Sequence, residues 1–492
     1  MNKGIFSRLG KKIFVGVVPI IFVGIFLCAK PVIKNIFVES DKYREPSTPP
    51  NSSFNDMRFY RCVVDEYNYV NETNLEYDVS LTDARLASIE SLTCGGRYYG
   101  EITDTSGIEK LTGLKSLTLV NNNFPTIDLS QNTQLTYLNL GEYENYSYNG
   151  NNITSINLSN NAELKELHLE GNDIENLNLS NNLKLEALYA SSNEFTELDL
   201  SHNTLLKRIR LISSKFTTID LTHNALLEEL DLSDTLIESI DLSQNVALKK
   251  LDIGGAWNTR KVYKRSDSIL TTIDLSHNTL LEELDLSSND LSTIDLQYNT
   301  ALKTLDLSTN NLNSIDLSHN SELVELVLDN VAVDSETNRN RFTSINLEDN
   351  SKLEVLNLSN NEISTIDLSH NTALKKLNLS DNELTGIDLR YNTGLIYLFL
   401  GSKSDSSNSF SSIDLSNNGS LEILDLHNIG LTSIDLSHNT LLKKLDLGSG
   451  AFGTNANNFP TIDLSHNTLL EELDLADLGL TSINLNNVVN LK

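Results

Sequence analysis

The amino-acid sequence predicts a solenoid of mostly short parallel β-strands, with two strands per 21-residue coil, about sixteen coils and a small α-helical cap at the N-terminal end. Two observations predict this fold. An Ile-Asp-Leu-Ser-type segment recurs sixteen times, and ten of the fifteen intervals between its occurrences are 21 residues long. Apolar and polar residues also alternate within each segment, which is the period of a strand with one buried face. Because a single coil cannot cover its own apolar side, stacked coils bury a continuous aliphatic core.

The repeat unit is clearest at residues 272–292, where two similar halves follow one another. The first half reads Ile-Asp-Leu-Ser-x-Asn, and the second, Leu-Asp-Leu-Ser-x-Asn, begins eleven residues later. The Asn that ends each half suits an inward-pointing ladder that bonds backbone groups where the chain turns. The aliphatic residue of the first half falls at Ile127, Ile156, Leu177, Leu198, Ile219, Ile240, Ile273, Ile294, Ile315, Ile345, Ile366, Ile387, Ile413, Ile434, Ile462 and Ile483.

Five insertions interrupt this period. The intervals that contain them are 26 to 33 residues long, which is one 21-residue unit plus extra residues. All five follow the second half of the unit, so we expect them to emerge along one edge of the solenoid. They cover approximately 141–151, 254–269, 329–341, 401–409 and 448–458.

Composition restricts the function. The 492 residues are 39% hydrophobic, and 37 Lys and Arg residues stand against 67 Asp and Glu residues, for a net charge of −30. A chain this acidic is repelled by polyanions, so we predict no nucleic-acid partner. The sequence contains no Gly-x-Ser-x-Gly, His-Glu-x-x-His or phosphate-binding-loop motif. Its acids and hydroxyls fall in rows instead of converging, so we predict that the protein is not an enzyme and uses no cofactor.

The N-terminus carries a membrane-targeting pattern. Residues 1–12 contain four basic residues and no acid, and residues 13–29 are uncharged. This pattern predicts a cleaved signal peptide or a retained single-pass anchor, oriented N-in, that places the rest of the chain outside the cell. The protein is then either secreted or held at the cell membrane. The expected organisation is a signal peptide or anchor over 1–29, a linker over 30–53, a helical cap over 54–110 and the solenoid over 111–492.

The consensus Leu-x-x-Leu-Asp-Leu-Ser-x-Asn-x-Leu resembles the leucine-rich repeat in its short bacterial form. Residues 59–68, 81–92 and 102–114 resemble parts of the helical N-terminal cap of bacterial surface proteins, including the internalin-like group. The resemblance covers roughly residues 54–492. It implies a leucine-rich-repeat solenoid with a role in extracellular recognition.

Two of the three cysteines, Cys62 and Cys94, fall within this cap. Three cysteines are too few for a disulfide-dense scaffold, and their spacing does not match a zinc site. An exported chain reaches an oxidising compartment, where a disulfide between these two residues would join the cap helices. Two buried free thiols are the alternative.

The second strand of each coil supplies the first candidate binding residues. In leucine-rich repeats this strand lines the inner face, where partners dock. Its outward residue varies along the chain, and residues that vary without harming the core are able to specify a ligand. His168, Tyr189 and Arg210 form a distinct patch on three successive coils, and Phe399 is an aromatic residue at the same position. Sequence drift on a solvated sheet is the competing interpretation.

Two insertions supply further candidates. The first insertion has the Tyr, Asn and Gly composition of binding loops, and its tyrosines are Tyr143, Tyr146 and Tyr148. The second insertion combines the only Trp with cations, which are the usual anchors of a recognition site, and its candidates are Trp257, Arg260, Lys261, Tyr263, Lys264 and Arg265. The second insertion would contact an anionic partner or fold back onto the protein's own acidic rows.

A metal site is not predicted. Seven histidines share one register before an Asn, and they are His202, His223, His277, His319, His370, His438 and His466. Because other residue types interrupt this register, no fixed set of ligands recurs, and we expect the histidines to be exposed polar corners. The aspartates of the first half are expected to attract calcium only loosely.

We therefore predict an extracytoplasmic, non-catalytic recognition or adhesion protein. It would bind a protein or a glycan through the inner sheet and the edge insertions. A passive spacer or a surface stalk that self-associates end to end is the alternative. A less favoured alternative is the substrate-recognition part of an enzyme whose catalytic module is absent from the chain.

Overall fold

The computed structural model describes residues 48–95, 101–144, 147–255, 270–330, 339–402, 408–449 and 455–492. The predicted signal peptide or anchor lies outside these ranges, and so does most of the predicted linker. Within the described ranges, no helix is both long enough and apolar enough to cross a bilayer.

From residue 48 onward, two α-helices and one short 3-10 helix precede the repeats among the described residues. Helix α2 (Met57–Asn71) begins after Asp56, whose carboxylate accepts a hydrogen bond from the Arg58 amide at 2.8 Å. The face of α2 that carries Phe59, Tyr60, Cys62, Val63 and Val64 is buried. The helix α3 (Asp83–Leu86) and the 3-10 helix η1 (Ile108–Lys110) are each about one turn long. Strand β1 (Ser91–Thr93) also lies within residues 54–110, so the sheet begins inside the segment predicted as a helical cap.

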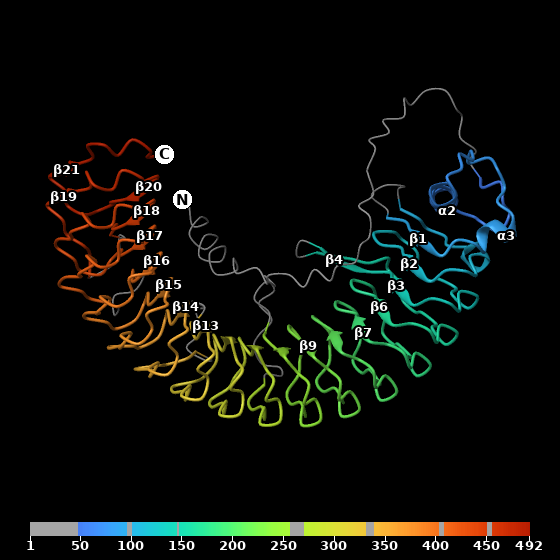
Figure 1. Ribbon diagram of the computed structural model, residues 1–492, viewed down its shortest axis with the longest axis horizontal. Helices are drawn as coiled ribbons and strands as arrows, with labels where there is room; N and C mark the ends of the chain where they lie inside the picture. The colour runs from blue at the N-terminus through green and yellow to red at the C-terminus, as the bar shows by residue number, and fades with distance from the viewer. Residues whose placement is uncertain are drawn as a thin grey trace. The chain divides into compact units, whose positions relative to one another are not determined.

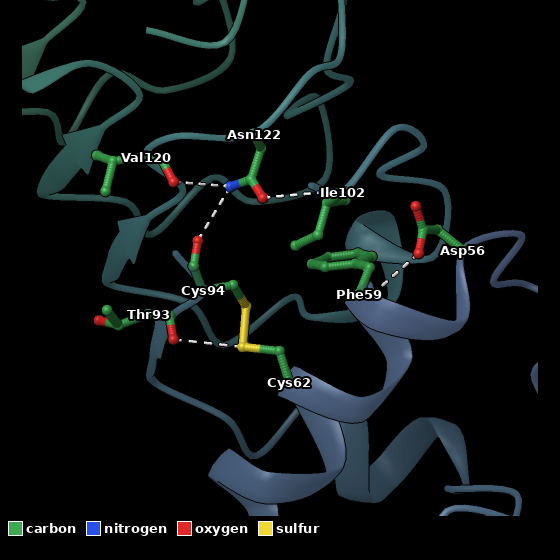
Figure 2. The surroundings of a disulfide bond; sticks show 8 residues. All are labelled: Asp56, Phe59, Cys62, Thr93, Cys94, Ile102, Val120 and Asn122. Atoms are coloured by element: carbon green, nitrogen blue, oxygen red, sulfur yellow. Dashed lines mark hydrogen bonds between the residues drawn. A yellow bond between two sulfur atoms is a disulfide. The ribbon is translucent and has the colours of Figure 1, made fainter. Parts of the chain in front are cut away.

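Cys62 and Cys94 form a disulfide whose Cα atoms lie 5.9 Å apart (Figure 2). Cys62 belongs to α2, and Cys94 directly follows β1. The bond therefore joins the helix to the first strand of the sheet, and not two helices as the sequence led us to expect. The side chain of Asn122 donates a hydrogen bond to the Cys94 carbonyl at 3.1 Å, which ties the same point to the next coil.

Seventeen three-residue strands, one from each coil and one from the cap, form a single parallel sheet (Figure 1). After β1 they are β2 (Ser116–Thr118), β3 (Tyr137–Asn139), β6 (Glu166–His168), β7 (Ala187–Tyr189), β8 (Arg208–Arg210), β9 (Glu229–Asp231), β10 (Lys250–Asp252), β11 (Glu283–Asp285), β12 (Thr304–Asp306), β13 (Glu325–Val327), β14 (Val355–Asn357), β15 (Lys376–Asn378), β16 (Tyr397–Phe399), β17 (Ile423–Asp425), β18 (Lys444–Asp446) and β20 (Glu472–Asp474). The middle Leu or Ile of each strand faces the core, and equivalent residues pair in register, as Leu284 does with Leu305. The predicted leucine-rich-repeat solenoid is confirmed.

The prediction of two strands per coil is wrong for most coils. The Ile-Asp-Leu half forms strands only at β19 (Thr461–Asp463) and β21 (Ser482–Asn484) among the described residues. The Asp carboxylate caps the turn that follows whether or not a strand forms, since Asp274 accepts from the Ser276 amide at 2.9 Å and Asp463 of β19 accepts from the Ser465 amide at 2.9 Å. Neighbouring segments on this side of the coils also lie farther apart than the strands do (Figure 1). Alternating polarity therefore reflects half-burial here and not strand pairing.

The predicted asparagine ladder is present. The side chain of Asn299, which is fully buried, donates to the carbonyls of Leu275 and Asn278, both at 3.0 Å. The ladder consists of Asn132, Asn161, Asn182, Asn203, Asn224, Asn245, Asn278, Asn299, Asn320, Asn350, Asn371, Asn392, Asn418, Asn439 and Asn467. The carbonyls that accept from Asn299 also accept from backbone amides within their own coil, so each asparagine adds a second hydrogen bond that ties its coil to the coil before it.

Candidate functional site

Each strand presents two side chains on the surface of the sheet, which we call the strand face. They are the first and third residues, because side chains alternate across a strand. Sequence reasoning followed only the third position, and it therefore missed Tyr137 and Arg208, which stand at the first position of β3 and β8. Because side chains alternate along a strand, the residue two places before each third position also faces outward, and this rule would have identified Tyr137 and Arg208.

His168, Tyr189 and Arg210 lie together on β6, β7 and β8, as the sequence indicated. The rings of His168 and Tyr189 stack with centroids 4.4 Å apart and planes 15° apart. The Tyr137 ring lies 5.5 Å from the His168 ring on the other side. Arg208 Nε donates to Tyr189 Oη at 3.0 Å, and the Arg210 guanidinium carbon lies 6.0 Å from the centre of the Tyr189 ring. We call these five residues the aromatic–arginine patch.

The patch holds three cationic side chains, and two of them are paired with carboxylates, since Arg210 Nε lies 3.3 Å from Asp231 Oδ2 and His168 lies between two glutamates. His168 Nε2 lies 2.9 Å from Glu166 Oε1, and His168 Nδ1 lies 3.7 Å from Glu170 Oε1. Burial alone would lower the pKa of His168, but the hydrogen bonds to Glu166 and Glu170 raise it to about 9. The imidazole is therefore protonated at neutral pH. Burial raises the pKa of Tyr189, so its phenol stays neutral.

The patch is followed along the strand face by a row of carboxylates. Asp231, Asp252, Asp285 and Asp306 are the third residues of β9 to β12 and lie opposite one another in register. Burial, together with the charge of Asp285, raises the pKa of Asp306 well above its usual value. Burial also raises the pKa of Asp329, which follows β13, to about 6. Asp306 and Asp329 therefore hold protons more tightly than isolated carboxylates.

We expect Asp306→Asn to stabilise the protein at neutral pH. A carboxyl group whose pKa is higher in the folded than in the unfolded chain contributes stability at low pH that is lost as pH rises through the folded pKa. The gain from the substitution should therefore be present at pH 7.5 and shrink toward zero as the pH falls to about 4, near the pKa of an unfolded Asp. Urea denaturation of the natural chain and of the Asp306→Asn variant across this pH range measures the gain.

Asp316→Asn is the matched control for this prediction. The Asp316 carboxylate is exposed and accepts a hydrogen bond from the Ser318 amide at 3.0 Å. The hydrogen bonds from Ser318 lower the pKa of Asp316, so removing its charge should bring no gain at pH 7.5. If the two variants shifted the urea midpoint equally at pH 7.5, the raised pKa of Asp306 would not be a source of instability at that pH.

The remaining sequence candidates are not part of the patch. Phe399 lies on β16, eight strands along the sheet from β8, beside Tyr397 of the same strand. The Lys376 ammonium lies 5.5 Å from the centre of the Tyr397 ring. Two of the first-insertion tyrosines fall on the hairpin of β4 (Glu142–Glu144) and β5 (Ser147–Asn149), where Tyr143 pairs with Tyr148. The other insertion candidates lie outside the described residues, namely Tyr146, Trp257, Arg260, Lys261, Tyr263, Lys264 and Arg265.

The histidine register agrees with the interpretation as exposed corners, since all seven side chains are exposed. Within the part of the chain that the structure describes, one group of possible metal ligands lies elsewhere. Asp425, His427 and Asp446 each offer one ligand atom, and these three atoms lie within 4.8 Å of one another. Sequence reasoning missed this group because His427 lies outside the repeated His-Asn register.

A parallel sheet of one short strand per 21-residue coil, with asparagine ladders and a variable strand face, defines a leucine-rich-repeat protein. The Leucine Rich repeat family model matches residues 277–297, 349–369 and 370–391. The chain is 41% identical over 70 residues to internalin J of Listeria monocytogenes serotype 4b (strain F2365). That match spans 13% of this chain and 7% of the length of that relative.

Solved structures extend the likeness to most of the chain. The functional domain of InlJ from Listeria monocytogenes, which includes a cysteine ladder, matches with a TM-score of 0.66 and 29% identity over 85% of this chain and 82% of that one. A leucine-rich-repeat protein of Leptospira interrogans matches with a TM-score of 0.55 and 21% identity over 74% and 85% of the two chains. The Drosophila Toll–Spatzle complex matches with a TM-score of 0.52 and 16% identity over 84% and 68%. The chain thus has the leucine-rich-repeat fold and is similar to internalin-like leucine-rich-repeat proteins of bacteria.

Proposed function

We propose that this chain is an extracytoplasmic, non-catalytic recognition protein that binds a protein partner at the aromatic–arginine patch. The observation that carries the proposal is the set of five side chains from four consecutive strands that the sheet holds in one stack. Tyr and Arg are the residues most enriched among those that dominate binding energy at protein interfaces. Rings already packed against one another lose little further freedom when a partner binds.

The charge of the patch defines the kind of partner. Protonated His168, Arg208 and Arg210 surround neutral tyrosine rings, and the neighbouring row on β9 to β12 is acidic. His168 is paired with Glu166 and Arg210 with Asp231, so an acidic group of the partner would exchange with these intramolecular carboxylates. A protein surface that pairs acidic and apolar side chains would match the patch, and a basic segment beside it would match the acidic row. Toll is bound to a protein ligand in the complex whose fold resembles this chain, which supports a protein partner.

Two features support an extracytoplasmic location. The basic N-terminal residues and the uncharged run that follows them are typical of exported chains. The Cys62–Cys94 disulfide is of a kind that persists in oxidising compartments. The repeats of this chain are also similar to those of internalin J and of the solved InlJ domain.

We expect Tyr189→Ala combined with Arg210→Ala to reduce binding of the labelled full chain to intact cells by at least ~30-fold, because a dominant interface residue contributes about 2 kcal/mol or more. A panel of bacterial and animal cells serves as the probe, and trypsin treatment of the cells should abolish binding. Tyr189 and Arg210 are only partly exposed, so thermal unfolding is measured first and binding is compared at a temperature at which the variant is folded.

The matched control is Tyr391→Ala combined with Arg390→Ala. These residues form a similar pair, with the Arg390 guanidinium carbon 5.9 Å from the centre of the Tyr391 ring, and both are exposed outside the strands. If the two double variants bound cells equally well, the aromatic–arginine patch would not be the binding site. Binding that survives trypsin but is lost after glycosidase treatment would replace the protein partner with a glycan.

A further inference from the structure

The cluster of Asp425, His427 and Asp446 lies at the end of strands β17 and β18. Asp425 and Asp446 are the last residues of these strands and stand opposite each other in register. His427 follows β17 by two residues, and its Nδ1 atom lies 2.6 Å from Asp425 Oδ1. The side chains of Asp425 and His427 are each 21% exposed, so solvent reaches the cluster.

The coil before it leaves room for this imidazole. The residue two places after the strand is Gly401 after β16 and Gly448 after β18, but only a Cβ atom on Gly401 would meet His427, because one on Gly448 would meet Asp474. Glycine also stands at this place at Gly141 and Gly254, and several other coils carry serine there. A Cβ atom on Gly401 would lie 2.2 Å from His427 Nδ1 and 2.4 Å from Asp425 Oδ1. Any larger residue at position 401 would therefore displace both groups.

Backbone conformation does not account for these two glycines. The glycines that adopt a positive φ are Gly107, Gly171, Gly430 and Gly479, and neither Gly401 nor Gly448 is among them. An L-residue would fit the backbone at both places, so the requirement is for space. At Gly401 the space is filled by the imidazole and carboxylate that would serve as metal ligands.

We propose that Asp425, His427 and Asp446 bind a divalent transition-metal ion of the Zn²⁺ type. The ligand atoms are close enough for one ion to contact all three. A set of one imidazole nitrogen and two carboxylate oxygens suits Zn²⁺ and its neighbours, whereas Ca²⁺ and Mg²⁺ favour oxygen ligands throughout. The charge of the ion would offset the repulsion between two facing carboxylates. Three protein ligands leave a coordination position for water or for a group from a partner.

The test is calorimetric titration of the full chain with Zn²⁺, with Ca²⁺ in parallel. We expect one Zn²⁺ per chain in the tightest class of sites and weaker Ca²⁺ binding. His427→Asn should reduce the affinity of that site by more than roughly 100-fold, since even residues that only position metal ligands are worth 10–100-fold. Asp446→Asn, which preserves shape and removes charge, should do the same and keeps the test decisive if His427→Asn folds poorly.

His438→Asn is the matched control, because His438 is an exposed member of the histidine register in the next coil. Its replacement should leave the tight site unchanged. Equal Zn²⁺ affinities in the His427 and His438 variants would overturn the site, and so would Ca²⁺ binding as tight as Zn²⁺ binding. The site is separate from the aromatic–arginine patch, so neither result bears on the proposed recognition function.

Discussion

Replacing Asn299 with alanine is expected to lower the free energy of unfolding by about 1–3 kcal/mol, because each of the two hydrogen bonds that are lost contributes roughly 0.5–1.5 kcal/mol. The substitution removes one donor from each of the carbonyls of Leu275 and Asn278, which lie inside the stack. Each carbonyl keeps a backbone donor, which is the Asn278 amide for Leu275 and the Leu281 amide for Asn278. No water can replace the donors without opening the coil, because Asn299 is fully buried.

Urea denaturation measures this loss, and hydrogen exchange locates it. Since each coil contacts only its neighbours, protection should fall most in the coils on either side of residue 299. Tyr298→Ala is the control, because the adjacent Tyr298 side chain is 51% exposed and its loss should cost less than about 0.5 kcal/mol. Similar losses in the two variants would show that the ladder contributes little.

Replacing both Cys62 and Cys94 with alanine is expected to cost about 3–4 kcal/mol. The disulfide closes a loop with a sequence separation of 32, and the loss of chain entropy on closing a loop of this size accounts for a stabilisation of that order. Because the bond ties α2 to the end of β1, its loss should also loosen the cap that covers the apolar side of the first coils.

Thermal unfolding with and without a reductant checks this second prediction. Reduction should lower the melting temperature of the natural chain and leave the double alanine variant unchanged. Cys28→Ala is the control, since Cys28 is the remaining cysteine and should not affect the response to reductant. A natural chain that melts at the same temperature after full reduction would contradict the stabilising role of the bond.

Much of the fold was predictable because the repeat expresses local rules many times over. The leucine positions, the parallel register and the inward asparagines each follow from a pattern that one coil shows weakly and sixteen coils show clearly. The prediction of a second strand in each coil was wrong for most coils. Alternating polarity indicates which side chains are buried, but it does not indicate whether neighbouring backbones are near enough to form hydrogen bonds. At Asp274 the side chain caps a turn, and the extended segment ends there.

The candidate site was predictable only in part. His168, Tyr189 and Arg210 stood out because they break the repeat at positions that must face outward. Tyr137 and Arg208 obey the same geometry, but they were passed over because only the third residue of each strand was followed. The cluster around His427 combines residues from two coils with a space left by Gly401 in a third. A repeat consensus describes one coil at a time, so it does not predict contacts of this kind.

The sequence by itself determined the coil, the aliphatic core and the buried ladders, because each depends on residue type at a fixed place within 21 residues. Only the tertiary structure decided which surface groups act together. Ring stacking at Tyr189, the raised pKa of Asp306 and the proximity of His427 to Asp446 depend on distances of a few ångströms between side chains of neighbouring coils. Rotamers and local burial set those distances, and the spacing of residues along the chain does not specify them.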